Sequence, residues 1–216
     1  HQVGEISLVH NGIIENYLEI KEELLAQGAV IASDTDSELV AHLIWNEIQK
    51  NQNLLQSVQN ILNKIIGAFS IVVLWEKSPN ELVAFKDGPP LIVGLSKDKS
   101  NSEFFVVSDV QAALVHTNRF VYLNDREVVH IKDHAVNYYN AQGEKLQKEV
   151  SILDWSTDRA EKMGFEHYML KEIYEQPRSV ANAMAPFIDT DTQSVKLTNI
   201  GFEAETVFKK IDRIIF

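Results

Sequence analysis

The tripeptide His10-Asn11-Gly12 is the first group of residues whose types and spacing could carry chemistry. A glycine lets the backbone approach a ligand with an unobstructed N–H, and an asparagine amide can donate a hydrogen bond beside it. Two donors that converge on one point stabilise the oxyanion of acyl transfer, and each contributes about 2.7–4 kcal/mol. We therefore predict Asn11 and Gly12 to be oxyanion donors and His10 to be a supporting residue behind them. A plain strand-to-helix turn is the alternative interpretation.

The acidic residues of Asp34-Thr35-Asp36 form a second candidate group. Capping of the following helix alone would explain them. A short strand is expected over 29–32, after a helix that carries the chain back along the sheet. If that strand runs parallel to the first, Asp36 emerges at the same edge as Asn11 and Gly12, where its carboxylate could bind an ammonium group of a ligand.

Other polar motifs have a structural explanation. The segments 87–91 and 108–109 stand at predicted strand ends, where turn formation and helix N-capping account for them. His130 and His134 flank a predicted hairpin turn and are interpreted as surface residues. The sequence contains neither a glycine-rich phosphate loop nor a His-Glu-x-x-His helix. We therefore expect no metal and no cofactor.

The elements that must position these residues follow from the spacing of apolar residues. A strand over 4–9 leads into the Asn-Gly turn, and an amphipathic helix follows from Ile13 until Gly28. Thr35 and Glu38 have the spacing of a capping box before the next helix, and a third helix precedes Gly67. Strands are then predicted over 68–75, 81–85, 91–93, 103–107, 120–123, 126–131 and 136–139. Early helices followed by many strands indicate an α+β layered fold.

The composition changes at about residue 154. The next residues are polar, a helix is predicted over 166–175, and Pro177 could end that helix or begin another one. A helical stretch over 203–210 and an apolar strand over 211–216 follow. We predict one domain over 1–153, and a connecting segment with the opening of a second domain over 154–216.

Composition and charge exclude several classes of protein. The chain has 216 residues, with 20 Lys and Arg against 31 Asp and Glu, a net charge of −11. An acidic surface repels phosphate backbones, so we expect no nucleic-acid partner. No apolar run is long enough to span a membrane and no secretory leader is present, so a cytoplasmic location is expected. The absence of Cys excludes disulfides and any thiol nucleophile carried by this chain.

Several segments together resemble one family. The segment 9–16 (Val-His-Asn-Gly-Ile-Ile-Glu-Asn) and the segment 33–38 are similar to the glutaminase domain of the glutamine–fructose-6-phosphate aminotransferases, which are class II amidotransferases. The resemblance continues through 67–69, 87–94, 108–114 and 167–177, the last of which (His-Tyr-Met-Leu-Lys-Glu-Ile-Tyr-Glu-Gln-Pro) is similar to the segment that joins that domain to a sugar-isomerase domain.

The resemblance implies a four-layer αββα N-terminal-nucleophile sandwich, here incomplete, followed by a helical interdomain segment and the first strand of a sugar-isomerase domain. In that family an N-terminal Cys attacks the side-chain amide of glutamine, and the ammonia passes to fructose 6-phosphate, which gives glucosamine 6-phosphate. Asn11 and Gly12 would form the oxyanion hole, and Asp36 would bind the α-amino group of glutamine. A homodimer or larger assembly is implied for the parent protein.

Important departures accompany the resemblance. The nucleophile is missing, as are the family's Arg-Gly-Tyr-Asp-Ser-Ala-Gly and Arg-Trp-Ala-Thr-His-Gly segments. We therefore expect an internal piece of such an enzyme that is inactive alone, and that is poorly soluble or oligomeric because incomplete sheets expose apolar surface. The alternatives are a noncatalytic scaffold or ligand-binding module, and a different class II amidotransferase.

Overall fold

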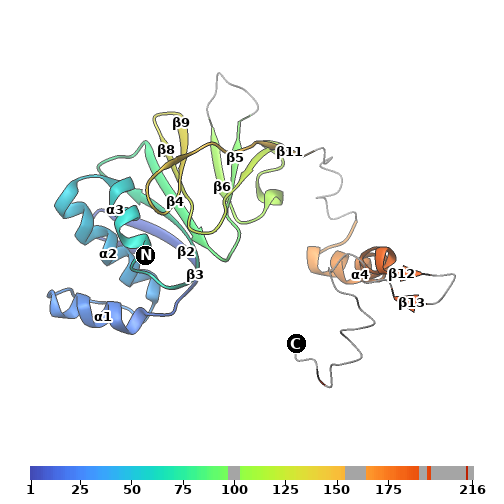
Figure 1. Ribbon diagram of the computed structural model, residues 1–216, viewed down its shortest axis with the longest axis horizontal. Coiled ribbons are helices and arrows are strands. Elements are labelled where there is room, and N and C mark those ends of the chain that lie inside the picture. Colours follow the sequence, from blue (N-terminus) through green and yellow to red (C-terminus); the bar gives the residue numbers. More distant parts are fainter. Residues whose placement is uncertain (97–102, 154–163, 190–193, 196–212, 214–216) are drawn as a thin grey trace. The chain divides into compact units, whose positions relative to one another are not determined.

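The computed structural model describes residues 1–96, 103–153, 164–189, 194–195 and 213 (Figure 1). The chain divides into two compact units, His1–Thr157 and Asp158–Phe216. The candidate site residues all belong to the first unit.

The first unit contains two antiparallel sheets. The larger has seven strands in the order β1-β2-β3-β4-β8-β9-β10 and the smaller has four in the order β11-β7-β5-β6. The strands of the larger sheet are β1 (Gln2–Val3), β2 (Ile6–Ile14), β3 (Gly67–Trp75), β4 (Glu81–Asp87), β8 (Val128–Lys132), β9 (Ala135–Tyr139) and β10 (Lys145–Leu146). Those of the smaller sheet are β5 (Ile92–Leu95), β6 (Phe104–Val107), β7 (Arg119–Tyr122) and β11 (Ser151–Ile152).

Three helices pack on one face of the larger sheet, and Figure 1 shows them together beside β2 and β3. These helices are α1 (Tyr17–Ala26), α2 (Asp36–Asn51) and α3 (Leu54–Leu62). Val40, Ile44 and Ile48 recur every fourth residue along α2, so they form one buried apolar stripe. The stripe packs against strand residues such as Leu8 and Ile71, which gives the main hydrophobic core.

The part of the opposite face formed by β4, β8 and β9 packs against the smaller sheet. Val93 and Val121 of the smaller sheet meet Ala84 and Val129 of the larger one in a second core. Because side chains alternate along a strand, β4 supplies Val83 and Phe85 to the helix side and Ala84 to the sheet side. The described residues of the first unit thus form a helix layer and two sheet layers, which is an α+β arrangement.

Three local expectations were wrong. Residues 10–12 do not form a turn, because β2 continues through them to Ile14 and pairs with β3 throughout. The first helix accordingly begins at Tyr17 rather than at Ile13. Residues 29–32 form no strand, so the chain enters α2 from irregular structure. Pairing with β3 overrides the local turn preference of Asn-Gly. At the end of the segment 29–32, the Glu38 carboxylate accepts the backbone hydrogen bonds of residues 32 and 33 that a neighbouring strand would otherwise accept.

Other predicted elements agree with the structure. The predicted strands between 68 and 139 correspond to β3 to β9. Asp109 caps the short 3₁₀ helix η1 (Val110–Ala112), because its carboxylate accepts a hydrogen bond from the Gln111 N–H at 2.8 Å.

The second unit contains α4 (Tyr168–Met184), the 3₁₀ helix η3 (Ala185–Phe187), and a hairpin of β12 (Ile188–Asp189) and β13 (Ser194–Val195). Pro177 neither ends nor begins a helix, because α4 runs through it. The helix predicted over 203–210 and the strand predicted over 211–216 fall outside the described residues, apart from Arg213. The proposed domain boundary at 153 stays a prediction.

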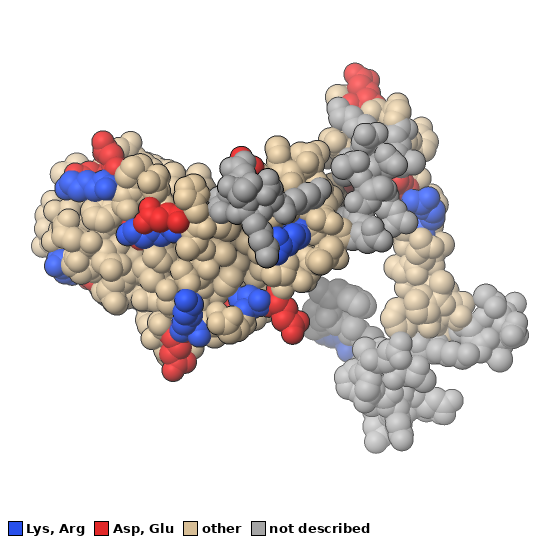
Figure 2. Space-filling model, turned by 90° about the horizontal axis from the view of Figure 1, so that it is seen from above, with Lys and Arg blue, Asp and Glu red and all other residues tan. Residues whose placement is uncertain are grey.

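Charged side chains of both signs share the face drawn in Figure 2, where they lie next to one another in small groups. Ion pairs of the first unit include Lys50–Glu47, Lys64–Glu23 and Lys77–Glu5. On that face the described residues form no continuous basic stripe of the kind that attracts a phosphate backbone. None of the helices in the described part of the chain has the length and hydropathy that a membrane span requires.

Candidate functional site

The candidate oxyanion donors lie near the end of β2. Asn11 pairs in register with Ser70 of β3, and Gly12 pairs with Phe69. Gly12 has φ 132°, and a Cβ atom there would lie 2.0 Å from the carbonyl oxygen of Ala68. Only glycine fits this close approach between the two strands. The backbone itself therefore requires a glycine at position 12, and this structural reason stands beside the functional interpretation.

Asp36 is the first residue of α2 and reaches β2 directly. Its Oδ2 accepts a hydrogen bond from the backbone N–H of Ile14 at 2.8 Å. Its Oδ1 lies 3.6 Å from Nδ1 of His10. A short strand over 29–32, parallel to the first strand, was expected to bring Asp36 to this edge, and the structure has no such strand. Helix α2 packs on β2 instead and brings Asp36 to the strand.

His10 lies under the candidate donors, on the helix side of the sheet. Its side chain is 2% exposed, and its Nδ1 is 2.9 Å from the Ser37 hydroxyl oxygen. Burial lowers the pKa of His10 below its ordinary value of 6.5, and the negative charge of Asp36 opposes this only in part. The imidazole therefore lies beside the Asp36 carboxylate and shares a hydrogen bond with Ser37. The contact with Ser37 gave no signal in the sequence.

Glu38 shapes the chain that leads into Asp36. Its side chain is 4% exposed, and its carboxylate accepts the N–H groups of Ala32 at 2.7 Å and Ser33 at 2.6 Å. Burial opposes ionisation of this carboxyl, yet the hydrogen bonds from Ser33 and Ala32 hold its pKa below the usual value. The expected capping box is therefore different in detail, since Glu38 bonds to residues before the N-cap Thr35, whose side chain makes no cap bond.

The structure brings together some of the predicted residues and separates others. His10 and Asp36 lie against each other, and Asp36 bonds to β2 two residues beyond Gly12. Asn11 shares its face of the sheet with Ser70, whereas His10 lies on the helix face. No hydrogen bond joins Asp36 to Asn11 or Gly12 among the described residues. The arrangement offers hydrogen-bond donors on β2 and one carboxylate beside them.

A metal centre has no support in the described part of the chain, which holds no cluster of three or more His, Asp or Glu side chains that could bind an ion. His130 contacts Glu81, with its Nε2 2.6 Å from the Glu81 Oε1. This mostly buried pair joins β8 to β4, so His130 is less exposed than its interpretation as a surface residue implied.

A family model for a glutamine amidotransferase domain matches residues 1–115. This match covers more than half of the chain and includes all the candidate site residues. The chain belongs to the glutamine amidotransferase domain family.

Three curated relatives of this amidotransferase domain have the same name. Glutamine–fructose-6-phosphate aminotransferase (isomerizing) from Aquifex aeolicus is 44% identical over 87% of the chain and 31% of its own length. The enzymes of the same name from Methanothermobacter thermautotrophicus and Clostridium acetobutylicum are 42% and 38% identical over 84% and 97% of the chain. The chain spans about a third of the length of these relatives, 30–33%.

Solved structures share the fold of this amidotransferase domain. A glutamine phosphoribosylpyrophosphate amidotransferase from B. subtilis superposes with a TM-score of 0.56 at 23% identity, over 67% of this chain and 31% of that one. A structure described as the allosteric regulatory enzyme of purine biosynthesis superposes with a TM-score of 0.53 at 26% identity, over 63% of this chain and 28% of that one. The chain therefore has the α+β fold of the N-terminal-nucleophile amidotransferases.

Proposed function

We propose that this chain is the glutamine-hydrolysing part of a glutamine–fructose-6-phosphate aminotransferase, which makes glucosamine 6-phosphate and glutamate for amino-sugar synthesis. The observation that supports the proposal is the hydrogen bond from the Ile14 N–H of β2 to the Asp36 carboxylate, two residues beyond Gly12. The curated relatives support the choice of fructose 6-phosphate as the acceptor of ammonia.

The proposed chemistry assigns each residue a role. A thiolate from outside this chain, which holds no Cys, attacks the side-chain amide carbon of glutamine. The carbonyl oxygen gains a negative charge, and the Asn11 amide and the Gly12 N–H stabilise it. The α-amino group of the same cysteine takes the thiol proton and passes it to the amide nitrogen, the C–N bond breaks and ammonia leaves. Water then hydrolyses the resulting thioester to glutamate and regenerates the thiol. Asp36 binds the α-ammonium group of the substrate, so it contributes in the ground state and the transition state alike.

The proposal extends to partners and location. Glutamine is the substrate of this part, ammonia passes to a sugar-isomerase domain of the parent protein, and the parent is a homodimer or larger assembly in the cytoplasm. No metal or organic cofactor enters the proposed steps.

The test compares the full-length gene product with variants. We expect fructose 6-phosphate-dependent formation of glucosamine 6-phosphate from glutamine, measured by coupled assay or mass spectrometry. Asn11→Ala is expected to lower kcat roughly 100- to 1,000-fold, as removal of one oxyanion donor does. Asp36→Asn is expected to raise the KM for glutamine, whereas Asp34→Asn, whose side chain is fully exposed, is the matched control and is expected to change neither.

The chain by itself is expected to release no ammonia from glutamine, because it holds no Cys. Glutamine binding without turnover by the full-length gene product would support the scaffold or ligand-binding alternative. Turnover with an acceptor other than fructose 6-phosphate would indicate a different class II amidotransferase.

A further inference from the structure

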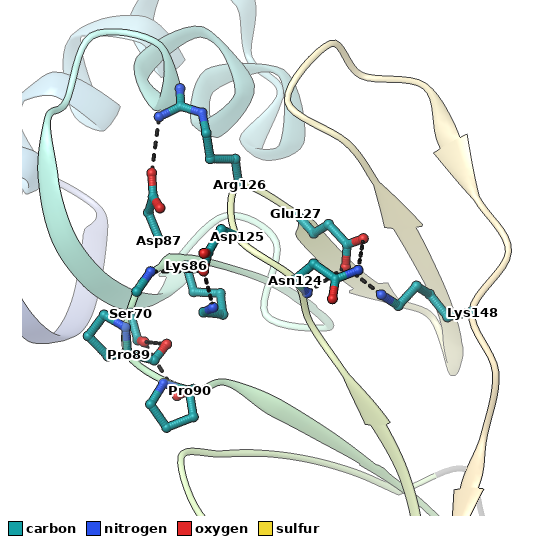
Figure 3. Close-up of polar contacts among 11 residues, drawn as sticks. Ser70, Lys86, Asp87, Pro89, Pro90, Asn124, Asp125, Arg126, Glu127 and Lys148 are labelled. Carbon is teal, nitrogen blue, oxygen red and sulfur yellow. Dashed lines mark hydrogen bonds and ion pairs between the residues drawn. The ribbon is translucent and has the colours of Figure 1, made fainter. Parts of the chain in front are cut away.

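The segment 87–91, which comprises the last residue of β4 and the loop to β5, is a motif that the proposed function does not use. Its backbone contacts β3, because the hydroxyl of Ser70 donates a hydrogen bond to the carbonyl oxygen of Pro89 at 2.8 Å (Figure 3). The carbonyl oxygen of Pro90 lies 3.4 Å from the same hydroxyl. Ser70 is buried, so these carbonyl oxygens decide where its proton points.

An ion pair between a buried lysine and a mostly exposed aspartate anchors this loop at its beginning. Lys86 is 6% exposed and pairs with Asp125, which lies in the turn before β8 (Figure 3). Asp125 Oδ1 also accepts the N–H of Gly88 at 2.9 Å. Arg126 adds two contacts, from its N–H to the Lys86 carbonyl oxygen at 2.7 Å and from its guanidinium to the Asp87 carboxylate at 3.2 Å. Lys86 and Asp125 therefore fix where the loop leaves β4.

Ser70 is the register partner of Asn11, and both side chains lie on the same face of the sheet. Opposite residues of an antiparallel pair have Cβ atoms about 4.5–5.5 Å apart, within reach of a hydrogen bond between a serine hydroxyl and an asparagine amide. Within the described ranges the Asn11 amide has no hydrogen-bond partner. The Pro89 carbonyl holds the hydroxyl proton of Ser70 away from Asn11, which leaves the amide able to turn toward a ligand.

We propose that the Lys86–Asp125 pair is a positioning pair for Asn11, because it keeps the Ser70 hydroxyl bonded to the 87–91 segment. The pair holds the Pro89 carbonyl near Ser70, and this carbonyl accepts the hydrogen bond of the Ser70 hydroxyl. The Asn11 amide then keeps the orientation needed for an oxyanion. Without the pair, the loop moves away and the Ser70 hydroxyl donates to the Asn11 side-chain oxygen, which turns the amide from the substrate. This inference rests on the proposed role of Asn11.

The chain offers a closely matched control for Lys86. Lys148 is another mostly buried lysine in an ion pair, with its Nζ 2.6 Å from Glu127 Oε2. Glu127 stands only two residues from Asp125, but its carboxylate accepts hydrogen bonds from Asn124 and does not contact the 87–91 loop (Figure 3). Lys→Met keeps most of the length of either side chain and removes its charge, so the two variants differ in which segment they release.

The first measurement is steady-state glutamine hydrolysis by the full-length gene product. In Lys86→Met we expect kcat to fall roughly ten- to a hundredfold with the KM for glutamine within about twofold, because Asn11 acts on the transition state. Lys148→Met is expected to match the unchanged protein. Adding Ser70→Ala to Lys86→Met removes the competing hydroxyl and is expected to restore most of the lost kcat, which a merely structural loss would not do.

The second measurement uses this chain and needs no activity. The side-chain amide signals of Asn11 in ¹H–¹⁵N NMR spectra are expected to shift in Lys86→Met, to stay unchanged in Lys148→Met, and to return when Ser70→Ala is added. Equal spectra for the two Lys→Met variants, or no return with Ser70→Ala, would overturn the inference. If the full-length gene product without substitutions does not turn over glutamine, or if Asn11→Ala is fully active, the proposed function is overturned. The NMR spectra would then decide whether the Lys86–Asp125 pair orients the Asn11 amide.

Discussion

Gly12 is the residue at which backbone geometry and proposed chemistry coincide. Replacement by alanine would place a Cβ 2.0 Å from the Ala68 carbonyl oxygen at a φ of 132°. Strand β3 would have to move, so we expect Gly12→Ala to lower the free energy of unfolding by about 3 kcal/mol or more. Chemical denaturation followed by circular dichroism measures this change.

Gly28 supplies the matched control. It also has positive φ, at 83°, but nothing lies within 4 Å of a Cβ atom placed there. Gly28→Ala is expected to cost only about 1 kcal/mol, the strain of a left-handed non-glycine residue. Equal losses in the two variants would show that the close approach of β2 and β3 is not what requires glycine at position 12.

His10 makes the stability of the first unit depend on pH. Because its folded pKa lies below the ordinary value of 6.5, the unfolded chain binds this proton more readily than the folded chain. The stabilisation is complete above pH 6.5 and is lost as the pH falls below that value toward the folded pKa. We expect His10→Gln to flatten the dependence of unfolding free energy on pH in this window. An unchanged slope would contradict the burial of a neutral imidazole.

Helix α2 brings Asp36 to β2, and Glu38 of the same helix holds the backbone of the segment that leads into it. Glu38→Gln keeps the size of the side chain but turns one acceptor oxygen into an NH₂ donor that faces the N–H groups of Ala32 and Ser33. We expect a loss of about 1–3 kcal/mol in unfolding free energy, together with faster amide hydrogen exchange at these two residues. Mass spectrometry or NMR measures the exchange.

Glu47 on the same helix provides the comparison. Its carboxylate bonds to the side chains of Lys50 and Asn60 rather than to backbone N–H groups. Glu47→Gln is therefore expected to cost less than about 0.5 kcal/mol and to leave exchange at Ala32 and Ser33 unchanged. A similar loss in both variants would mean that Glu38 has no special part in holding the segment before Asp36.

At the level of the whole molecule, apolar side chains are exposed on β2 and β3, on the face of the sheet opposite the helices. Val9 is 68% exposed and Leu74 is 48% exposed, on neighbouring strands. Apolar surface of this kind favours association, so we expect sedimentation velocity to show oligomers of the isolated chain. The double change Val9→Thr and Leu74→Thr is expected to raise the monomer fraction. Val30→Thr, at an exposed valine in the irregular segment before α2, is expected to leave it unchanged.

The sequence by itself determined the chemistry that can be assigned to this chain and most of its elements. Apolar periodicity located α2, α3 and the strands from β3 to β9, because burial on one face imposes a repeat on neighbouring residues. The residue types at Asn11, Gly12 and Asp36 indicated hydrogen-bond donors and a carboxylate. The capacity to donate or to carry a charge belongs to the residue type and does not depend on the fold.

Only the tertiary structure decided which of these residues meet. Asn-Gly has a strong turn preference, yet β3 pairs with β2 along its whole length and keeps it extended. Asp36 reaches β2 across the packing of a helix on a sheet, and Ser70, Lys86 and Asp125 become neighbours of the candidate site through strand register and loop contacts. Such contacts join residues far apart in the chain, so their free energy leaves no periodic pattern along it.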